Sequence, residues 1–248
     1  MRASDPHASS GGASVGAAEA LRCRLSIIVP ALDESACIET TLRSLQSERA
    51  KGAEIIVVDG GSGDDTAQRA RPLADRVIVT EAGRGAQMNV GARLASGRTL
   101  LFLHADTRMS PAAFAALDAA LRARKERWGR FDLSIEGRAA LLRVVARMIS
   151  LRSRFTGIAT GDQGIFVARA LFERVGGYRE IALMEDVALC ASLKRAAGRP
   201  LCIAERICTS GRRWERKGTW RTIVLVWRLR LQFWLGHDPA VLARHYER

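Results

Sequence analysis

The chain has 248 residues, of which 48% are hydrophobic and 26% are charged. This balance is typical of a folded globular protein and excludes disordered and collagen-like classes. Lys and Arg total 39 against 26 Asp and Glu, which gives a net charge of +13. All but four of these basic residues are Arg, whose planar guanidinium group suits phosphate and carboxylate. No apolar run approaches the ~20 residues of a membrane span.

The cysteines and the start of the chain indicate the compartment. The five Cys, at 23, 37, 190, 202 and 208, form no Cys-x-x-Cys pair. A disulfide framework and a zinc knuckle are therefore disfavoured, and a reducing cytoplasm is expected. Residues 1–22 are rich in Ser, Gly and Ala and lack the apolar core of a signal peptide. They are predicted to be a disordered tail in front of a single domain, residues 23–248.

Strand and helix patterns alternate through the first half of this domain. Short apolar runs predict strands, and apolar residues at helical spacing predict helices. The expected strands are 25–29, 54–58, 76–79 and 99–103, and the expected helices are 38–45, 64–73 and 84–95. This order predicts an α/β fold with a mostly parallel central sheet and helices on both faces.

The second half is less regular and ends in a basic tail. Strands are expected at 131–135, 164–167 and 201–207, helices at 111–124, 137–151, 168–175 and 187–197, and a helical tail at 219–246. In the tail, apolar residues recur every three or four positions beside Arg: Trp220, Ile223, Val224, Trp227, Leu231 and Trp234. An interfacial helix and a helix packed on the sheet with Arg outward both fit this pattern. No motif supports a nucleic-acid partner, so none is expected.

Acidic residues follow three of the expected strands, at the end where α/β sheets bind ligands. The three turns are Pro30-Ala31-Leu32-Asp33-Glu34, Asp59-Gly60-Gly61-Ser62-Gly63 and His104-Ala105-Asp106. Carboxylates gathered at one sheet edge bind a cation or accept hydrogen bonds from sugar hydroxyls. Strand 25–29 is not followed by Gly-x-Gly-x-x-Gly, and no P-loop motif occurs. NAD enzymes and P-loop NTPases are therefore disfavoured.

These three blocks, followed by Glu185-Asp186, resemble in order and spacing the successive motifs of family 2 glycosyltransferases, which have the GT-A fold. The resemblance extends from Leu25 to about Trp214. It implies an inverting enzyme that moves a sugar from a nucleoside diphosphate sugar, with UDP as the usual carrier and GDP as an alternative, to an acceptor hydroxyl. The nucleotide site that it implies consists of Pro30, Asp33, Glu34, Asp59, Gly60, Arg84 and His104. Helix capping is the alternative role for Asp33 and Asp59.

The metal-binding motif of the family is Asp-x-Asp, and this chain departs from it at the first position. The resemblance implies that Asp106 holds a divalent metal, Mn²⁺ or Mg²⁺, against the diphosphate. Three roles remain open for His104: a contact with the ribose, a nitrogen ligand to Mn²⁺, or a structural residue.

The resemblance also implies the catalytic and acceptor residues. Asp186 would be the general base and Glu185 its support, although both acids also suit the N-terminus of helix 187–197. Asp162 and Gln163 match the acceptor-side loop. The implied contacts with acceptor and diphosphate continue in Arg212, Arg213 and Trp214, for which a solvated basic turn is the alternative.

Two other functions remain open. A degenerate transferase could serve as a peripheral membrane or nucleic-acid binding module, and a nucleotidyltransferase could use a related sheet. The acidic turn after strand 25–29 argues against the latter, which usually has a Gly-rich basic turn there. If the acceptor is lipid-linked, the tail would contact the inner face of the membrane.

Overall fold

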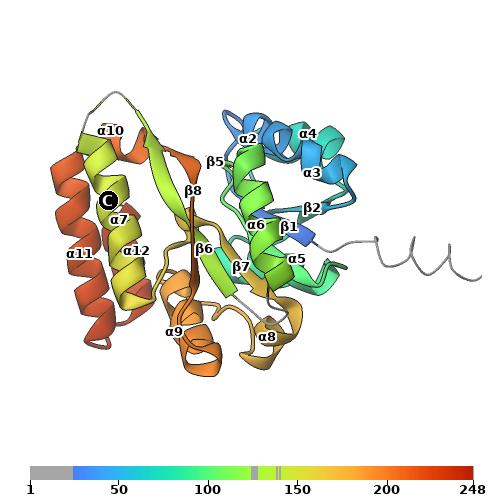
Figure 1. Ribbon diagram of the computed structural model, residues 1–248. Helices are drawn as coiled ribbons and strands as arrows, with labels where there is room; N and C mark the ends of the chain where they lie inside the picture. Colours follow the sequence, from blue (N-terminus) through green and yellow to red (C-terminus); the bar gives the residue numbers. More distant parts are fainter. Residues whose placement is uncertain (1–24, 124–127, 138, 140, 248) are drawn as a thin grey trace, which may run out of the picture.

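The structure, a computed structural model, describes residues 25–123, 128–137, 139 and 141–247. The expected tail at residues 1–22 lies outside this part of the chain. The strands form one sheet of order β3-β2-β1-β4-β7-β6-β8-β5, with helices on both of its faces (Figure 1). They are β1 (Leu25–Ala31), β2 (Glu54–Asp59), β3 (Arg76–Val79), β4 (Thr99–Phe102), β5 (Thr107–Arg108), β6 (Trp128–Glu136), β7 (Ile165–Ala168) and β8 (Leu201–Ser210).

The helices lie close to the expected ranges. They are α2 (Ile38–Ser44), α3 (Gln46–Ala50), α4 (Thr66–Ala70), α5 (Arg84–Leu94), α6 (Pro111–Ala123), α7 (Leu141–Thr156), α8 (Arg169–Arg174), α9 (Glu185–Ala197), α10 (Arg212–Lys217), α11 (Thr219–Trp234) and α12 (Pro239–Glu247), with short 3₁₀ helices η1 (Arg71–Leu73) and η2 (Gly161–Gln163). The expected helix 137–151 begins later, at Leu141, because β6 continues to Glu136. The expected helix 64–73 is divided into α4 and η1 at Arg71, just before Pro72.

The first half of the sheet is parallel, as predicted. β3, β2, β1 and β4 pair in parallel, and Ala31 at the end of β1 is opposite Asp59 at the end of β2. The turns after these strands therefore meet at one edge of the sheet.

The second half mixes directions. β7 is antiparallel to both β4 and β6, whereas β8 runs parallel to β6. The two-residue strand β5, which the sequence analysis did not anticipate, pairs antiparallel with β8 and aligns Thr107 with Thr209. This pairing brings the segment after β4 beside the end of β8, more than 100 residues later. The predicted α/β class with a mostly parallel sheet and helices on both faces is confirmed.

Each face of the sheet has its own apolar core. On one face, α2, α6 and α7 contribute to one cluster, in which α6 lies against β8 and α7 against β6, with Leu42, Phe114 and Val145 as examples. On the other face, α5 packs against β1 and β2, α8 packs against β7, and α9 contacts α5 and α8, with Met88, Phe172 and Leu189 as examples. Because β1, β2 and β4 are covered on both sides, they read as continuous apolar runs rather than as alternating patterns, whereas the edge strand β3 is partly exposed.

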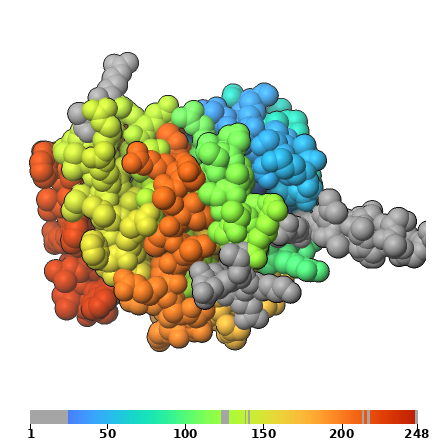
Figure 2. All heavy atoms as spheres, in the orientation of Figure 1, coloured from blue at the N-terminus to red at the C-terminus, as the bar shows by residue number. Residues whose placement is uncertain are grey.

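The C-terminal helices α11 and α12 pack together beside the start of α9. Leu229 of α11 and Leu242 of α12 are both buried, and they join Leu183, Met184 and Val187 in a third apolar cluster. α7 and the C-terminal helices lie along the same side of the molecule (Figures 1 and 2). None of the described helices has the length and hydropathy needed to cross a membrane.

Candidate functional site

The turn after β2 is organised by Asp59. This residue is only 2% exposed. Its carboxylate accepts hydrogen bonds from the backbone N–H of Gly61 (3.1 Å) and Ser62 (2.9 Å) and from the Ser62 hydroxyl (2.5 Å). Oδ1 thus accepts one bond, and its second lone pair can receive another from a ligand.

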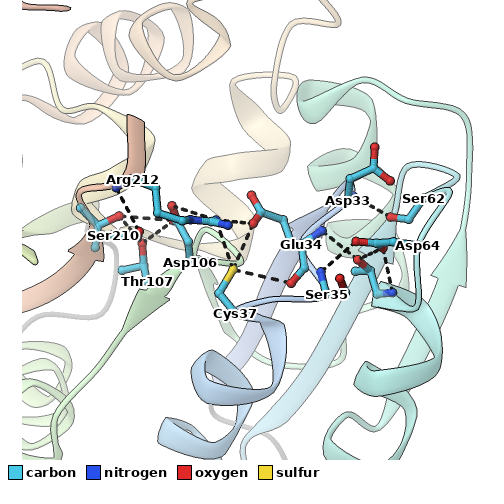
Figure 3. Close-up of polar contacts among 12 residues, drawn as sticks. Asp33, Glu34, Ser35, Cys37, Ser62, Asp64, Asp106, Thr107, Ser210 and Arg212 are labelled. Carbon is cyan, nitrogen blue, oxygen red and sulfur yellow. Dashed lines mark hydrogen bonds and ion pairs between the residues drawn. The ribbon is translucent and has the colours of Figure 1, made fainter. Parts of the chain in front are cut away.

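The turns after β1 and β2 are bonded to each other. The Asp33 carboxylate accepts a hydrogen bond from the Gly63 N–H at 2.8 Å, and the Asp33 N–H donates to Ser62 Oγ at 2.9 Å (Figure 3). The Glu34 N–H donates to Thr66 Oγ1 at 2.8 Å. Asp33 has a φ of 53°, a left-handed conformation that Asp tolerates better than most residues. The two acidic turns therefore form one joined rim, as a single nucleoside site would require.

A residue that sequence reasoning missed supports this rim from below. Gln87 of α5 is buried, and its Nε2 donates to the carbonyl oxygens of Ala31 (2.9 Å) and Val58 (2.8 Å). Gly60 lies directly against this side chain, so a Cβ there would be only 3.2 Å from Gln87 Nε2. Gln87 is one polar residue within a predicted helix, and nothing in the sequence indicated that it bonds the ends of two strands.

Asp106 and Glu34 converge on one guanidinium group (Figure 3). Arg212 Nη2 lies 2.5 Å from Glu34 Oε2 and 4.0 Å from Asp106 Oδ2. Asp106 Oδ1 also accepts hydrogen bonds from the hydroxyls of Thr107 (3.4 Å) and Thr209 (3.3 Å). Burial raises the pKa of the Asp106 carboxyl, and the nearby charge of Glu34 raises it further, whereas Arg212 lowers it. The arrangement gathers negative charge where a cation would be stabilised.

The protein supplies few metal ligands at this point. Within the part of the chain that the structure describes, no group of three or more His, Cys, Asp or Glu is arranged to hold a metal ion. Cys37 Sγ lies 3.0 Å from Glu34 Oε2, but burial and the Glu34 charge raise the pKa of the thiol to about 12, so it is no thiolate ligand. Asp106 and Glu34 fit the other common arrangement, in which one or two carboxylates share a cation with substrate phosphates and water.

The second acidic pair opens α9. Asp186 Oδ2 accepts a hydrogen bond from the Gly161 N–H at 2.7 Å, and Oδ1 accepts one from the Val187 N–H at 2.6 Å. Glu185 is buried and pairs with Arg84 at 3.4 Å. Burial and the neighbouring charge of Asp186 raise the pKa of Glu185. Arg84, expected beside the phosphates, thus contacts the acidic pair.

A strained residue precedes the pair. Met184 has a φ of 70°, a left-handed conformation that is unfavourable for a residue with a Cβ. It is held by the apolar cluster that α11 and α12 complete. The C-terminal helices therefore help to position Glu185 and Asp186. Acidic residues at a helix N-terminus do not need such support from distant helices.

The loop at η2 supports two different roles. The Oδ1 atom of Asp162 is buried and has no hydrogen-bond partner among the described residues. Gln163, in contrast, is fully buried and donates from Nε2 to Ser153 Oγ at 3.0 Å. Its Oε1 accepts from the Thr160 N–H at 3.3 Å. The Oδ1 atom of Asp162 is thus available to a ligand, whereas the side chain of Gln163 holds the loop in place.

His104 links the His104-Ala105-Asp106 turn to the acidic pair Glu185-Asp186. A Cβ on Gly161 would collide with His104 Nε2, so the imidazole lies directly on the backbone whose N–H bonds Asp186. The only residue type that permits this approach without displacement is glycine. His104 therefore faces the acceptor loop.

The Arg212-Arg213-Trp214 segment is divided between two environments. Arg212 reaches Glu34 and Asp106, whereas Trp214 is partly buried against the core on the α6 and α7 face. The side chain of Arg213 lies outside the described part of the chain. The segment is the start of helix α10, not a solvated turn.

Two further arginines near the acidic pair were not identified from the sequence. Arg152 of α7 and Arg230 of α11 each carry a buried nitrogen that has no hydrogen-bond partner among the described residues. Burial and repulsion by Arg230 lower the pKa of Arg152 to about 10. Nothing in the spacing of the Arg residues distinguished these two from the exposed Arg residues of the same helices.

Comparison with known sequences finds glycosyltransferases among the proteins that this chain resembles. The family model described as "Glycosyl transferase family 2" matches residues 26–126. A "PGL/p-HBAD biosynthesis glycosyltransferase" of Mycobacterium bovis BCG is 32% identical over 177 residues. An "uncharacterized glycosyltransferase" of Mycobacterium tuberculosis is 32% identical over 165 residues. Each match spans 62% of this chain and 62% of the relative, so the chain covers less than two thirds of their length.

Comparison with solved structures gives the fold of a larger part. Residues 1–349 of Staphylococcus aureus TarS superpose with a TM-score of 0.59 and 20% identity, over 76% of this chain and 60% of that one. A mannosyltransferase of Pyrobaculum calidifontis with GDP-Man and Mn²⁺ gives 0.56 and 24%, over 75% and 56%. A glucosyl-3-phosphoglycerate synthase of Mycobacterium tuberculosis with Mn²⁺ and UDP gives 0.57 and 20%, over 83% and 77%. The predicted GT-A fold is confirmed.

Proposed function

We propose that this chain, which belongs to glycosyltransferase family 2 through residues 26–126, transfers a sugar from a nucleoside diphosphate sugar to an acceptor hydroxyl. The observation that carries the proposal is the contact of His104 with Gly161, whose N–H bonds Asp186. It joins an acidic rim suited to a nucleoside with a carboxylate suited to proton abstraction. UDP is the nucleotide carrier that we favour for this chain. GDP is the alternative, because the similar P. calidifontis mannosyltransferase was solved with GDP-Man.

Asp186 is the general base of the proposed reaction. Its carboxylate removes the proton of the acceptor hydroxyl as that oxygen attacks the anomeric carbon, and the bond from this carbon to the diphosphate breaks on the opposite face. The result is inversion. The Gly161 N–H at 2.7 Å orients Oδ2, and Glu185, paired with Arg84, supports the base by fixing the start of α9.

The donor occupies the joined acidic rim. Asp33, Glu34 and Asp59 accept hydrogen bonds from the base and the ribose, while the backbone at Pro30 and Gly60 shapes the floor of the site. Asp106 would hold a divalent cation, Mn²⁺ or Mg²⁺, together with Glu34. When bound, such a cation neutralises the diphosphate as it leaves. Arg212 lies within 4.0 Å of Asp106 and contributes a second positive charge.

The test of this function is the substitution Asp186→Asn. Release of UDP or GDP from UDP-glucose, UDP-N-acetylglucosamine and GDP-mannose is measured in the presence of a lipid extract. We expect the turnover seen with the preferred donor to fall by about 10²–10⁴-fold, the usual contribution of a general base. Binding of the nucleotide, followed as a rise in Tm, should remain.

The matched control is Glu173→Gln, which changes an exposed carboxylate on α8. It should leave turnover unchanged. Normal turnover in Asp186→Asn would refute the base assignment. Retention on lipid without any nucleotide binding would instead indicate a degenerate transferase.

We also propose that the molecule docks on an anionic membrane through an apolar face formed by α7 and α11. This apolar face consists of nine exposed side chains: Val144, Met148, Leu151, Phe155, Trp220, Val224, Trp227, Leu231 and Trp234. Trp220 is 70% and Trp234 is 83% exposed. Monomeric proteins rarely expose a contiguous apolar surface of this kind without a binding role. Arg221 and Arg228 of α11 are exposed together with the Trp residues, whereas Arg230 is partly buried.

Charge favours lipid over a second copy of the chain as the occupant of this face. α7 and α11 carry four exposed Arg residues, at positions 143, 147, 221 and 228, and contain no Asp or Glu. Pairing of the face with its own copy would bring Arg against Arg, whereas anionic headgroups complement Arg and the Trp side chains suit the membrane interface.

Vesicle sedimentation tests the docking. Phosphatidylglycerol vesicles should retain the protein, and Trp227→Gln combined with Trp234→Gln should release it, while Val79→Gln, an exposed apolar site on β3, should not. Equal retention on phosphatidylcholine vesicles, or a dimer in light scattering that the Trp substitutions abolish, would overturn the proposal.

A further inference from the structure

Two guanidinium groups from different helices lie beside the proposed base. Arg152 on α7 and Arg230 on α11 are close enough for Arg230 to repel the charge of Arg152. Both interact electrostatically with Asp162 and Asp186. These four charges therefore share one partly buried region at the acceptor end of the site.

The two arginines are poorly paired within the protein. Arg152 makes one long hydrogen bond, from Nη2 to Thr160 Oγ1 at 3.4 Å, and its Nε is buried without a partner among the described residues. Arg230 Nη1 is also buried and has no hydrogen-bond partner among the described residues. Among the described residues, no ion pair within 4.0 Å joins either arginine to Asp162 or Asp186.

Such an arrangement is unfavourable unless a ligand completes it. A buried guanidinium nitrogen without a hydrogen-bond acceptor loses its hydration, and a second positive charge nearby adds repulsion. Asp162 and Asp186 attract both groups but form no ion pair with either among the described residues, so the missing hydrogen bonds are not replaced. An anion that accepts bonds from both groups removes both penalties. Phosphate and carboxylate match the planar fork of Arg and can be bound through two parallel hydrogen bonds.

The residues near Arg152 and Arg230 indicate whether the anion is a group of the donor or of the acceptor. Both arginines interact electrostatically with Asp186, the proposed base, and with Asp162, and Arg152 bonds Thr160, next to the Gly161 N–H that binds Asp186. The proposed donor diphosphate has its own positive partner in Arg212, which pairs with Glu34 and Asp106. The two guanidinium groups therefore belong to the Asp186 end of the proposed site, where the acceptor hydroxyl would lie.

We propose that Arg152 and Arg230 form an anion subsite that binds a phosphate or carboxylate group of the acceptor, next to the hydroxyl that receives the sugar. This inference rests on the proposed transferase function for the identity of the acceptor, but the anion site itself is independent of it. An acceptor of this class is selected because an uncharged molecule would leave both arginines unpaired.

The test uses inorganic phosphate as the probe and the full chain saturated with UDP and Mn²⁺, so that the donor site is filled. Phosphate is titrated by calorimetry. We expect binding to the wild type and a loss of at least tenfold in affinity in Arg230→Gln and in Arg152→Gln. Arg228→Gln, which changes an exposed arginine of α11, should bind phosphate as the wild type does.

Stability separates this role from a structural one. Without phosphate, Arg230→Gln should leave Tm unchanged or raise it, because an unpaired buried charge is removed. A large drop in Tm, or equal phosphate binding in the wild type and Arg230→Gln, would overturn the proposal. Absence of UDP binding in the wild type would refute the transferase function instead, and phosphate binding without UDP would still test the subsite.

A second arm identifies the source of the anion. Glycerol 3-phosphate in solution is compared with phosphatidylglycerol in vesicles, each with the wild type, Arg230→Gln and Arg228→Gln. Affinity that depends on Arg230 with both ligands supports a subsite open to any phosphate. Dependence confined to vesicles supports a lipid headgroup. If Arg230→Gln changes the affinity for neither ligand and also leaves the affinity for inorganic phosphate unchanged, the proposed subsite is overturned.

Discussion

At the scale of single residues, the site depends on one close approach between a side chain and a backbone. His104 occupies the space where a side chain at position 161 would begin, and the same glycine donates its N–H to Asp186. A small change at position 161 is therefore expected to alter both the position of His104 and that of Asp186, the proposed base. Although His104 replaces the first Asp of the Asp-x-Asp motif, its side chain is held in a fixed position by this contact with Gly161.

The substitution Gly161→Ala tests this contact. We expect a loss of about 1–3 kcal/mol in the free energy of unfolding, because a methyl group is forced into a filled space. Urea denaturation measures the loss. In the double variant with His104→Ala the two losses should not add, because the colliding ring is gone. Gly63→Ala, where a Cβ meets no atom closer than 3.9 Å, is the control. Additive losses would show that the two residues do not interact.

Asp64 predicts a pH dependence of stability in the acidic turns. Its carboxylate accepts hydrogen bonds from the Ser35 N–H (3.1 Å) and from the N–H and hydroxyl of Thr66, and these bonds hold its pKa well below the usual value. Because the folded pKa is depressed, the stabilisation is complete above the unfolded pKa of about 3.9 and is lost as the pH falls towards the folded pKa.

The measurement compares Tm in the wild type and Asp64→Asn between pH 3 and 7. We expect the wild type to be more stable above about pH 5, and the difference to shrink below about pH 4. Asp65→Asn is the control, since the Asp65 side chain makes no capping bond to α4. A difference that is constant across this range would contradict the assignment.

At the scale of elements, α11 has apolar residues on two sides. Leu229 is buried in the cluster with α9 and α12, whereas the Trp residues face outward. The helix therefore has one side that fixes the start of α9 and another that is available to a partner. If the proposed docking occurs, α11 would connect it to the position of Glu185 and Asp186.

Two substitutions separate these sides of α11. Leu229→Ala should lower the free energy of unfolding by about 2–5 kcal/mol, because it removes a buried side chain and leaves a cavity. Trp227→Ala, at a position that is 60% exposed, should change it by less than about 0.5 kcal/mol. Chemical denaturation measures both. Comparable losses in the two variants would mean that Trp227 packs against the protein.

At the scale of the whole molecule, the site is assembled from both halves of the sheet. The parallel half supplies Asp33, Glu34 and Asp59, and the mixed half supplies Arg212 and the loop before β7. A donor and a metal ion bound between them must stabilise both halves at once. Ligand binding should therefore raise the Tm of the whole transition.

The prediction is that UDP with Mn²⁺ stabilises the protein by about 2.7 kcal/mol at 100 times the Kd, and that UDP with EDTA stabilises it less. Asp106→Asn should remove the part that depends on Mn²⁺, while Glu173→Gln should keep it. Calorimetric unfolding measures the shifts. An identical rise in the wild type and Asp106→Asn would exclude Asp106 as a metal ligand.

The sequence by itself determined the α/β class, the first four strands and the acidic residues at their ends, because a buried parallel strand needs an apolar run and the turn that follows it reaches one sheet edge. Tertiary structure alone decided the rest. The pairing of β5 with β8 brings Arg212 to Glu34 across 178 positions. Arg152 and Arg230 meet from two helices, and α11 turns its Trp residues outward although either of its sides could have been buried. Local spacing cannot determine these features, because each depends on which distant segment packs against the helix or strand.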